Sequence, residues 1–514
     1  MVNKIEMESV TPVVSRLRSW TAQIIACMSP NLLLLDLGMA ITFAIIAMPD
    51  LLNAPEGLSL DEDQASWFGS ISFLTQPFGA VFSGPLVDFF GRKKANFLAN
   101  VPHLIAWTLL YNATNMPILF IASALLGLGT GVMEAPINAY VGEITEPNTR
   151  GALCTLTQLF TSAGVLLMYF LGTVVHWRTA ALICMSAPIA SMICVLLVPE
   201  TPVWLLSRGR EKEALTSLRY LRGWTRSENV REEFDNLVVY TKNLERCVIC
   251  SNTPGLDALN CEHHLMNPIK RKILKIRYVM FCKETMRPLM LTIMYFSLHI
   301  LSGFAAIRPN LVNVCGALGM PGSRSNIMLI VGIITFVAAL ATVPIVKLTG
   351  KRKLAITAML GCAISTTGLA IYARANLDDS VYSYDASTFP TELSHVPEIL
   401  FFMLVVFNGL GIPWVLLGEV FPFRSRTTAQ GIAAAANYVI NFFAAKTFID
   451  VEAGLGLWGA FVVYSIFGYL GVLYLYFFLP ETEGKTLIEI ESYYNGKLRT
   501  FADDPFIRLF RKSD

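Results

Sequence analysis

Charged residues are scarce in this chain. Asp, Glu, Lys and Arg make up 15% of the 514 residues, whereas soluble proteins carry about 25%. This scarcity excludes an ordinary soluble enzyme, and the hydrophobic fraction of 54% excludes a disordered or collagen-like chain. A net charge of only +2 gives no reason to expect a nucleic-acid partner. The composition instead indicates a protein embedded in a lipid bilayer.

Two familiar signals are also missing. The first twenty residues are polar and of mixed charge, so we expect no cleavable signal peptide and expect the first apolar segment to direct insertion. No glycine-rich phosphate-binding motif is present, so the sequence offers no site for nucleotide-driven work. We therefore expect neither an enzyme nor a cofactor.

Apolar runs long enough to cross a bilayer, about 20 residues each, recur along the chain. They predict an all-α membrane protein with twelve transmembrane helices. The expected spans lie near residues 22–50, 66–89, 95–112, 116–139, 152–175, 178–198, 288–312, 326–349, 354–373, 397–418, 427–450 and 456–479. The resulting division is a tail (1–21), a six-helix bundle (22–198), a central loop with short helices (199–287), a second six-helix bundle (288–479) and a tail (480–514).

The basic residues predict the orientation of these spans. If the N-terminus is cytoplasmic, nearly all of the 40 Lys and Arg residues fall in the tails and in cytoplasmic loops. Positive residues concentrate on the cytoplasmic side of membrane proteins. We therefore expect a multi-pass plasma-membrane protein with both termini in the cytoplasm.

Short motifs repeat between the two sets of six spans. Residues 84–93 and 348–353 are both glycine turns followed by basic residues, and residues 140–151 share a Gly-Glu and a following arginine with residues 418–426. Such repetition favours two bundles related by pseudo-symmetry, with a binding site between them near the middle of the membrane.

Acidic and basic residues at the inner ends of these spans form a candidate gate. Carboxylates and guanidinium groups there can pair between helices and hold the inner side closed. Alternatively, they only anchor the topology. The residues are Asp88, Arg92, Glu143, Arg150, Glu419 and Arg424.

Six blocks of sequence together resemble the sugar porter family of the major facilitator superfamily. The blocks are residues 84–93, 140–151, 199–205, 302–303, 412–422 and 480–486. The Glu134-Ala-Pro136 segment is most similar to insect facilitated trehalose transporter-like members. The resemblance implies the major facilitator fold and transport of a sugar by alternating access, with the sugar bound by hydrogen bonds and aromatic stacking.

The resemblance also implies site residues. Gln158, Trp414, Asn437 and Asn441 match the family's polar and aromatic sugar contacts, although the asparagines could instead join helices and Trp414 could simply pack. Span seven departs from the family, because residues 299–305 read His-Ile-Leu-Ser-Gly-Phe-Ala where the family has three amides. Ser123 replaces the family's span-four arginine, and Lys347 lies where an acidic residue is expected.

Two ionisable residues are expected near the middle of the membrane, as judged by the number of residues that separate each from the inner end of its span. Glu134 could accept a bond from a sugar hydroxyl, couple transport to protons, or form a structural bond near Pro136. His299 could contact the ligand or bond a neighbouring helix. Charged groups at such depth are costly and are usually partnered or functional.

The leading hypothesis is facilitated diffusion of a hexose or a disaccharide such as trehalose by a monomer. Proton symporters of the family carry a span-one aspartate that residues 43–47 lack, so proton symport is less favoured. The loss of the span-seven amides leaves a second alternative, a sugar sensor that binds without transporting.

Two further sites are possible. Cys247, Cys250, Cys261 and His263 have a spacing that could bind Zn²⁺, or they are reduced thiols in a loose loop. Asn112-Ala-Thr114 is an acceptor pattern for N-glycosylation, close to the membrane on both sides.

Overall fold

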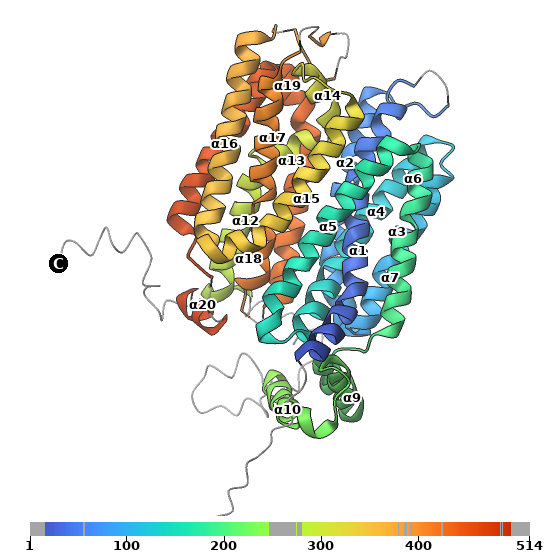
Figure 1. The fold of residues 1–514 in the computed structure, drawn as a ribbon, viewed down its shortest axis with the longest axis vertical. Coiled ribbons are helices and arrows are strands. Elements are labelled where there is room, and N and C mark those ends of the chain that lie inside the picture. The colour runs from blue at the N-terminus through green and yellow to red at the C-terminus, as the bar shows by residue number, and fades with distance from the viewer. Residues whose placement is uncertain are drawn as a thin grey trace, which may run out of the picture.

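The computed structural model describes residues 16–54, 57–245, 274, 280–378, 380–384, 388–390, 393–422, 425–483, 485 and 487–494. Within these ranges the chain is almost entirely helical (Figure 1). The β-pairing there is limited to one isolated bridge, between Leu52 and Leu60. The all-α class expected from hydropathy is therefore confirmed.

The first half of the chain forms helices that lie together on one side of the molecule (Figure 1). They are α1 (Arg16–Leu51), α2 (Glu62–Phe90), α3 (Arg92–Tyr111), α4 (Met116–Ile144), α5 (Pro147–Val174), α6 (Trp177–Cys184) and α7 (Ser186–Leu197). We call this set the N-terminal half. Each of its six expected spans coincides with helix, and the sixth is divided between α6 and α7 at Met185.

The second half lies on the other side of the molecule (Figure 1). It contains α12 (Lys283–Ile300), α13 (Phe304–Ile307), η3 (Arg308–Asn310), α14 (Leu311–Ala317), α15 (Arg324–Thr349), α16 (Lys351–Asn376), α17 (His395–Gly409), α18 (Pro413–Glu419), α19 (Arg426–Phe478) and α20 (Leu487–Tyr494). We call this set the C-terminal half. Its six expected spans also coincide with helix.

Breaks within these helices differ from the uninterrupted spans that were expected. The seventh span bends by 56° between α12 and α13, where Gly303 has a φ of 118°. The eleventh and twelfth merge into α19 across Gly456, whose φ of 73° lies outside the helical region. Both dihedrals favour glycine. Within the described residues, seven helices are long and apolar enough to cross a membrane, or eight if the bent pair counts as one.

Helices within the N-terminal half approach closely at glycines. A Cβ placed on Gly164 of α5 would lie 3.1 Å from the Cα of Gly38 on α1. The contact therefore requires small residues on both helices. Lipid gives helices little hydrophobic reason to associate, so close packing of this kind carries much of the helix–helix attraction in membranes.

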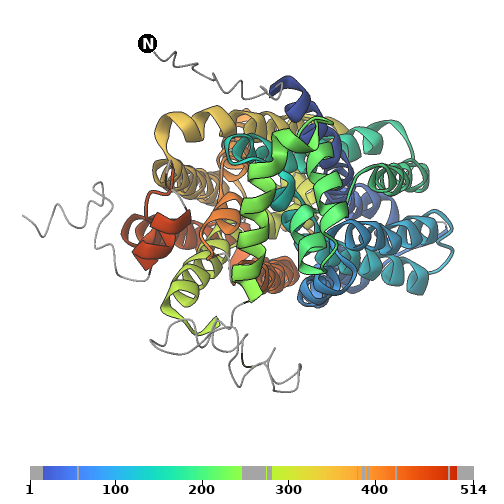
Figure 2. The same cartoon turned by 90° about the horizontal axis from the view of Figure 1, so that it is seen from below.

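Short helices from the middle of the chain lie at one end of the molecule (Figures 1 and 2). They are α8 (Pro202–Ser207), α9 (Glu211–Leu221), η1 (Ser227–Val230) and α10 (Arg231–Glu245). Arg222 lies between α9 and η1, donates to the Ile144 carbonyl at 3.2 Å and approaches Glu146 at 3.3 Å. Ser217 donates to the Glu200 carbonyl at 2.5 Å. These bonds attach the short helices to the N-terminal half.

A buried carboxylate connects α1 to α3. Trp107 Nε1 donates to Asp36 Oδ1 at 2.7 Å, and His103 Nδ1 lies 2.5 Å from Asp36 Oδ2. All three side chains are fully buried. Because a buried carboxylate without partners is costly, this cluster fixes how α1 and α3 lie against each other.

We expect Asp36→Ala to destabilise the protein by about 2 kcal/mol or more, since two buried donors lose their acceptor. Thermal unfolding of the detergent-solubilised protein measures the loss. Asp50→Ala is the matched control, because Asp50 lies on the same helix but is 52% exposed. An equal shift in both variants would contradict the structural role of Asp36.

Candidate functional site

Three of the chain's aromatic residues and one carboxylate meet where the two halves face each other. The Tyr438 hydroxyl on α19 donates a hydrogen bond to Glu134 Oε1 on α4. The Trp414 ring on α18 lies 6.1 Å from the Tyr438 ring and 5.0 Å from the Phe296 ring on α12. We call Glu134, Phe296, Trp414 and Tyr438 the central cluster. Its members come from both halves of the chain.

The break between α17 and α18 positions Trp414. Pro413 begins α18, where a missing N–H is tolerated, and Trp414 follows it, 36% exposed. The break also needs a small residue, since a Cβ on Gly411 would lie 2.5 Å from His299 Cε1. Residues 411–413 thus place the Trp414 indole against Phe296 and Tyr438.

The structure places His299 within the C-terminal half. Its Nε2 lies 3.4 Å from Asn408 Nδ2, and its ring lies 6.1 Å from the Tyr295 ring. Its Nδ1 is buried and has no hydrogen-bond partner among the described residues. This geometry corresponds to the interhelical alternative for His299.

The other predicted sugar contacts form no hydrogen bond with the central cluster in the described part of the chain. Asn441 Nδ2 donates to the Asn437 carbonyl at 3.0 Å, and Asn437 is buried within the C-terminal half. Gln158 is exposed on α5. In the described part of the chain its side chain forms no hydrogen bond to the central cluster.

Sequence reasoning missed Tyr438 and Phe296. Both are aromatic residues in apolar runs, where packing is the usual role. Tyr438 is adjacent to the predicted Asn437, and Phe296 lies one helical turn before His299. This proximity was the only signal that could have identified them.

Carboxylates and basic residues join helices at the end of the N-terminal half where α3 begins. Arg92 Nη2 lies 2.7 Å from Glu143 Oε1, and Thr201 Oγ1 donates to Glu143 Oε2 at 2.6 Å. Glu200 accepts from the backbone N–H of Arg92 at 3.1 Å and of Lys93 at 3.0 Å. Burial raises the pKa of Glu200, and backbone donors such as these oppose the rise.

The C-terminal half repeats this arrangement. Glu481 accepts from the backbone N–H of Lys351 at 3.0 Å and of Arg352 at 3.1 Å. Lys351 Nζ bonds Glu419 at 2.5 Å and Glu483 at 2.9 Å. In each half, the glutamate of a Pro-Glu-Thr segment (Glu200 or Glu481) binds at a helix N-terminus, where the helix dipole favours negative charge.

The candidate gate residues are therefore only partly paired as expected. Arg92 meets Glu143, but Glu419 meets Lys351 rather than an arginine. Asp88 is exposed, and its backbone carbonyl accepts from Arg208 at 2.8 Å. The Arg150 side chain and Arg424 lie outside the described residues. The pairs that are described each join helices within one half.

Further contacts between the halves lie at the opposite end, where α2 begins. Lys446 Nζ on α19 donates to Ser66 Oγ on α2 at 3.1 Å and lies 4.8 Å from the centre of the Trp67 ring. The Trp67 ring is in turn 6.2 Å from the Phe442 ring. Lys446 of the C-terminal half thus contacts Ser66 and Trp67 of the N-terminal half and connects the two at this end.

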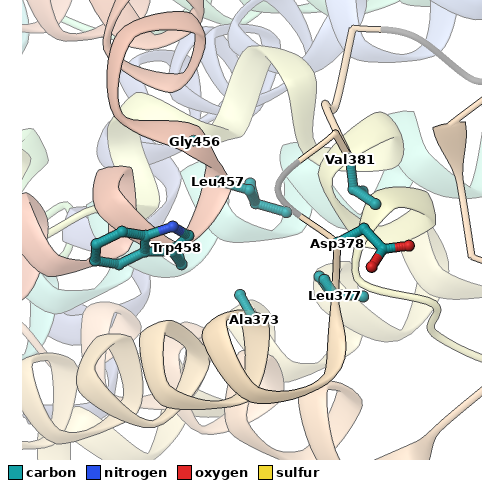
Figure 3. A pocket seen from close by; sticks show the side chains of 7 residues that line it. All are labelled: Ala373, Leu377, Asp378, Val381, Gly456, Leu457 and Trp458. Carbon is teal, nitrogen blue, oxygen red and sulfur yellow. The ribbon is translucent and has the colours of Figure 1, made fainter.

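A small pocket lies away from the central cluster, beside the Gly456 break (Figure 3). Its lining residues come from the end of α16, the following loop and α19: Ala373, Leu377, Asp378, Val381, Gly456, Leu457 and Trp458. None of the predicted site residues lines it.

Of the predicted glycosylation and zinc sites, only the glycosylation site lies within the described residues. Asn112 is exposed at the end of α3, and its Nδ2 donates to the Thr108 carbonyl at 2.8 Å. Cys247, Cys250, Cys261 and His263 lie outside the described residues. In the described ranges, no group of three or more His, Cys, Asp or Glu residues could hold a metal ion.

Residues 24–494 match the protein family described as "Sugar (and other) transporter". The "Facilitated trehalose transporter Tret1" of Anopheles gambiae is 29% identical over 505 residues, which cover 96% of this chain and 59% of that protein. The protein of the same name from Polypedilum vanderplanki is 27% identical, with 96% and 92% covered.

Solved structures share the fold. The proton:xylose symporter XylE bound to 6-bromo-6-deoxy-D-glucose superposes with a TM-score of 0.68 at 21% identity, covering 93% of this chain and 99% of that one. A partially occluded, inward-open form of XylE from E. coli gives 0.66 at 20% identity, covering 91% and 100%.

We expect a double-mutant cycle on Arg92→Ala and Glu143→Ala to give a coupling energy of about 1.5–3 kcal/mol, because the bond is charge-assisted and mostly buried. Chemical or thermal unfolding measures it. The exposed pair Arg210 and Glu213 is the matched control and should give about 0–1 kcal/mol. Equal coupling in both cycles would show that burial does not strengthen the Arg92 bond.

Proposed function

Since the chain belongs to the Sugar (and other) transporter family, and is a transporter rather than an enzyme, we propose that it carries a sugar down its concentration gradient by alternating access. Residues 22–198 and 288–479 act as two pseudo-symmetric bundles of six spans. They rock about the seam between them in a monomer in the plasma membrane, with both termini in the cytoplasm.

The central cluster is the observation that carries this proposal. It combines a carboxylate with aromatic faces at the contact between the halves. Each sugar hydroxyl that leaves water needs a replacement partner, while the sugar's C–H faces pack on rings. Glu134 supplies an acceptor and Trp414 supplies a ring.

The substrate class follows from the similar proteins. Curated relatives over nearly the whole chain are named as facilitated trehalose transporters, which supports trehalose or a hexose as substrate. The chain spans only about 59% of the Anopheles relative. These relatives are named as transporters, so the sensor alternative gains no support from them.

Two observations favour uniport over proton symport. Residues 43–47 contain no carboxylate, and the nearby Asp36 already accepts a hydrogen bond from Trp107 and lies beside His103 inside one half. Symport is the second candidate, because the similar solved structures are titled as proton symporters and Glu134 is a carboxylate between the halves.

The contacts between the halves suggest which side is closed. Nearly all of the basic residues fall at the end with α9 and α10, which we assign to the cytoplasm. The Lys446 contacts lie at the other end, so this structure corresponds to a state closed toward the outside.

We expect the purified protein in liposomes to take up labelled trehalose or glucose until the internal and external concentrations are equal. Trp414→Ala should raise the half-saturation concentration by about 2- to 10-fold, since it removes an aromatic contact. Accumulation above equality that a protonophore abolishes would establish symport instead. Absence of uptake and of exchange for every labelled sugar would refute transport.

We expect Lys446→Met to shift the protein toward outward-open states, since Ser66 and Trp67 lose the cation that connects the halves. Spin labels at the exposed residues Asp63 and Asp450 should move apart in the distance distribution. Lys353→Met, at the opposite end of the molecule, is the control. An unchanged distribution in Lys446→Met would mean that Lys446 does not hold this end closed.

A further inference from the structure

The hydrogen bond between Tyr438 and Glu134 has an unusual setting. It joins α19 to α4 and so connects the two halves at the central cluster. The Tyr438 side chain is only 6% exposed and packs against Ala80 of α2 and Ala434 of its own helix. The ring is therefore held in the seam, and its hydroxyl extends from the seam to the carboxylate.

Among the described residues, Glu134 has no charged counterpart. Its bond in the described structure comes from the Tyr438 hydroxyl, and the ion pairs formed among the described residues do not include it. The residue is only partly buried, unlike its neighbours Met133 and Ala135. A carboxylate oxygen is thus bonded to a neutral O–H group while the residue still borders accessible space.

A phenol and a sugar hydroxyl present the same donor to a carboxylate, namely one O–H group. This inference rests on the proposed function. We propose that Tyr438 is a built-in substitute for a substrate hydroxyl: its O–H bonds the same oxygen of Glu134, Oε1, that a sugar hydroxyl takes on binding.

Two consequences follow from this exchange. First, Oε1 of Glu134 keeps a donor throughout, because one hydroxyl leaves as the other arrives; the net gain in binding free energy is therefore smaller than for an acceptor that had no donor. Second, the sugar breaks a bond that joins the halves. A ligand that removes such a bond binds the separated arrangement more tightly and so shifts the population toward it. Tyr438 therefore sets both the affinity for the sugar and the extent to which sugar binding separates the two halves.

Tyr438→Phe tests the proposal, because it removes the hydroxyl and keeps the ring in the seam. Equilibrium binding of labelled trehalose and glucose to the purified protein should tighten, with a dissociation constant lowered by about fivefold. An ordinary sugar-contacting tyrosine predicts the opposite sign, and a packing tyrosine predicts no change. Either of those results would overturn the proposal.

Matched variants separate this effect from a general loosening. Tyr464→Phe removes a buried hydroxyl from the same helix, where Tyr464 stacks on Phe448, and should leave binding unchanged. In a Glu134→Leu background, Tyr438→Phe should no longer tighten binding, since the contested acceptor is gone. A persisting gain there would refute competition at Glu134.

Monodeoxy analogues of glucose identify the hydroxyl involved. For one of them the gain from Tyr438→Phe should disappear, because that analogue has no O–H to place on Glu134. An equal gain for every analogue would contradict the exchange. If the wild-type chain transports sugar but Tyr438→Phe weakens binding, only this inference fails; if neither protein binds any sugar, the proposed function fails with it.

Discussion

Buried and half-buried carboxylates that need hydrogen-bond donors organise this structure. In lipid, the hydrophobic effect contributes little to helix–helix association. Specific polar bonds therefore decide which helices pack together and how they are aligned along their axes. Asp36 joins α1 to α3, Glu200 and Glu481 bind at the N-termini of α3 and α16, and Glu134 reaches across the seam to Tyr438. The first three stiffen each half internally. The last is the kind of bond that can be exchanged without unfolding either half.

The two halves share one arrangement of carboxylates at a helix N-terminus but build it with different basic residues. Glu200 and Glu481 each follow a proline and precede a threonine, and each accepts from the first two backbone N–H groups of the helix that it faces. The neighbouring acidic residue is then neutralised by an arginine in one half and a lysine in the other. Arginine offers a planar fork and lysine a point charge, so Glu143 receives two bonds from one guanidinium while Lys351 is shared between two carboxylates.

Hydropathy was sufficient to predict the helical class, since each apolar run needs its backbone bonds satisfied internally, and each predicted span coincides with helix in the described residues. Seven of these helices, or eight with the bent pair, are long and apolar enough to cross a membrane. Hydropathy could not predict the breaks at Gly303 and Gly456, because a glycine in an apolar run is common in unbroken helices as well. The Arg92–Glu143 pair follows from motif spacing. The partner of Glu419 could not be predicted, because it depends on the position of Lys351 at the start of α16. Tyr438 could not be predicted either, because its bond to Glu134 depends on α4 and α19 lying side by side.

The attachment of the short central helices to one half has a practical meaning. Arg222 bonds the Ile144 carbonyl and Glu146 as well as Glu233 of α10, and Ser217 bonds the Glu200 carbonyl just after α7. If the two halves rock as proposed above, the contacts of Arg222 with Ile144, Glu146 and Glu233 make the short helices move with the N-terminal half. A reporter at Val239 of α10, which is 59% exposed, should then follow the N-terminal half and separate its movement from that of the other half.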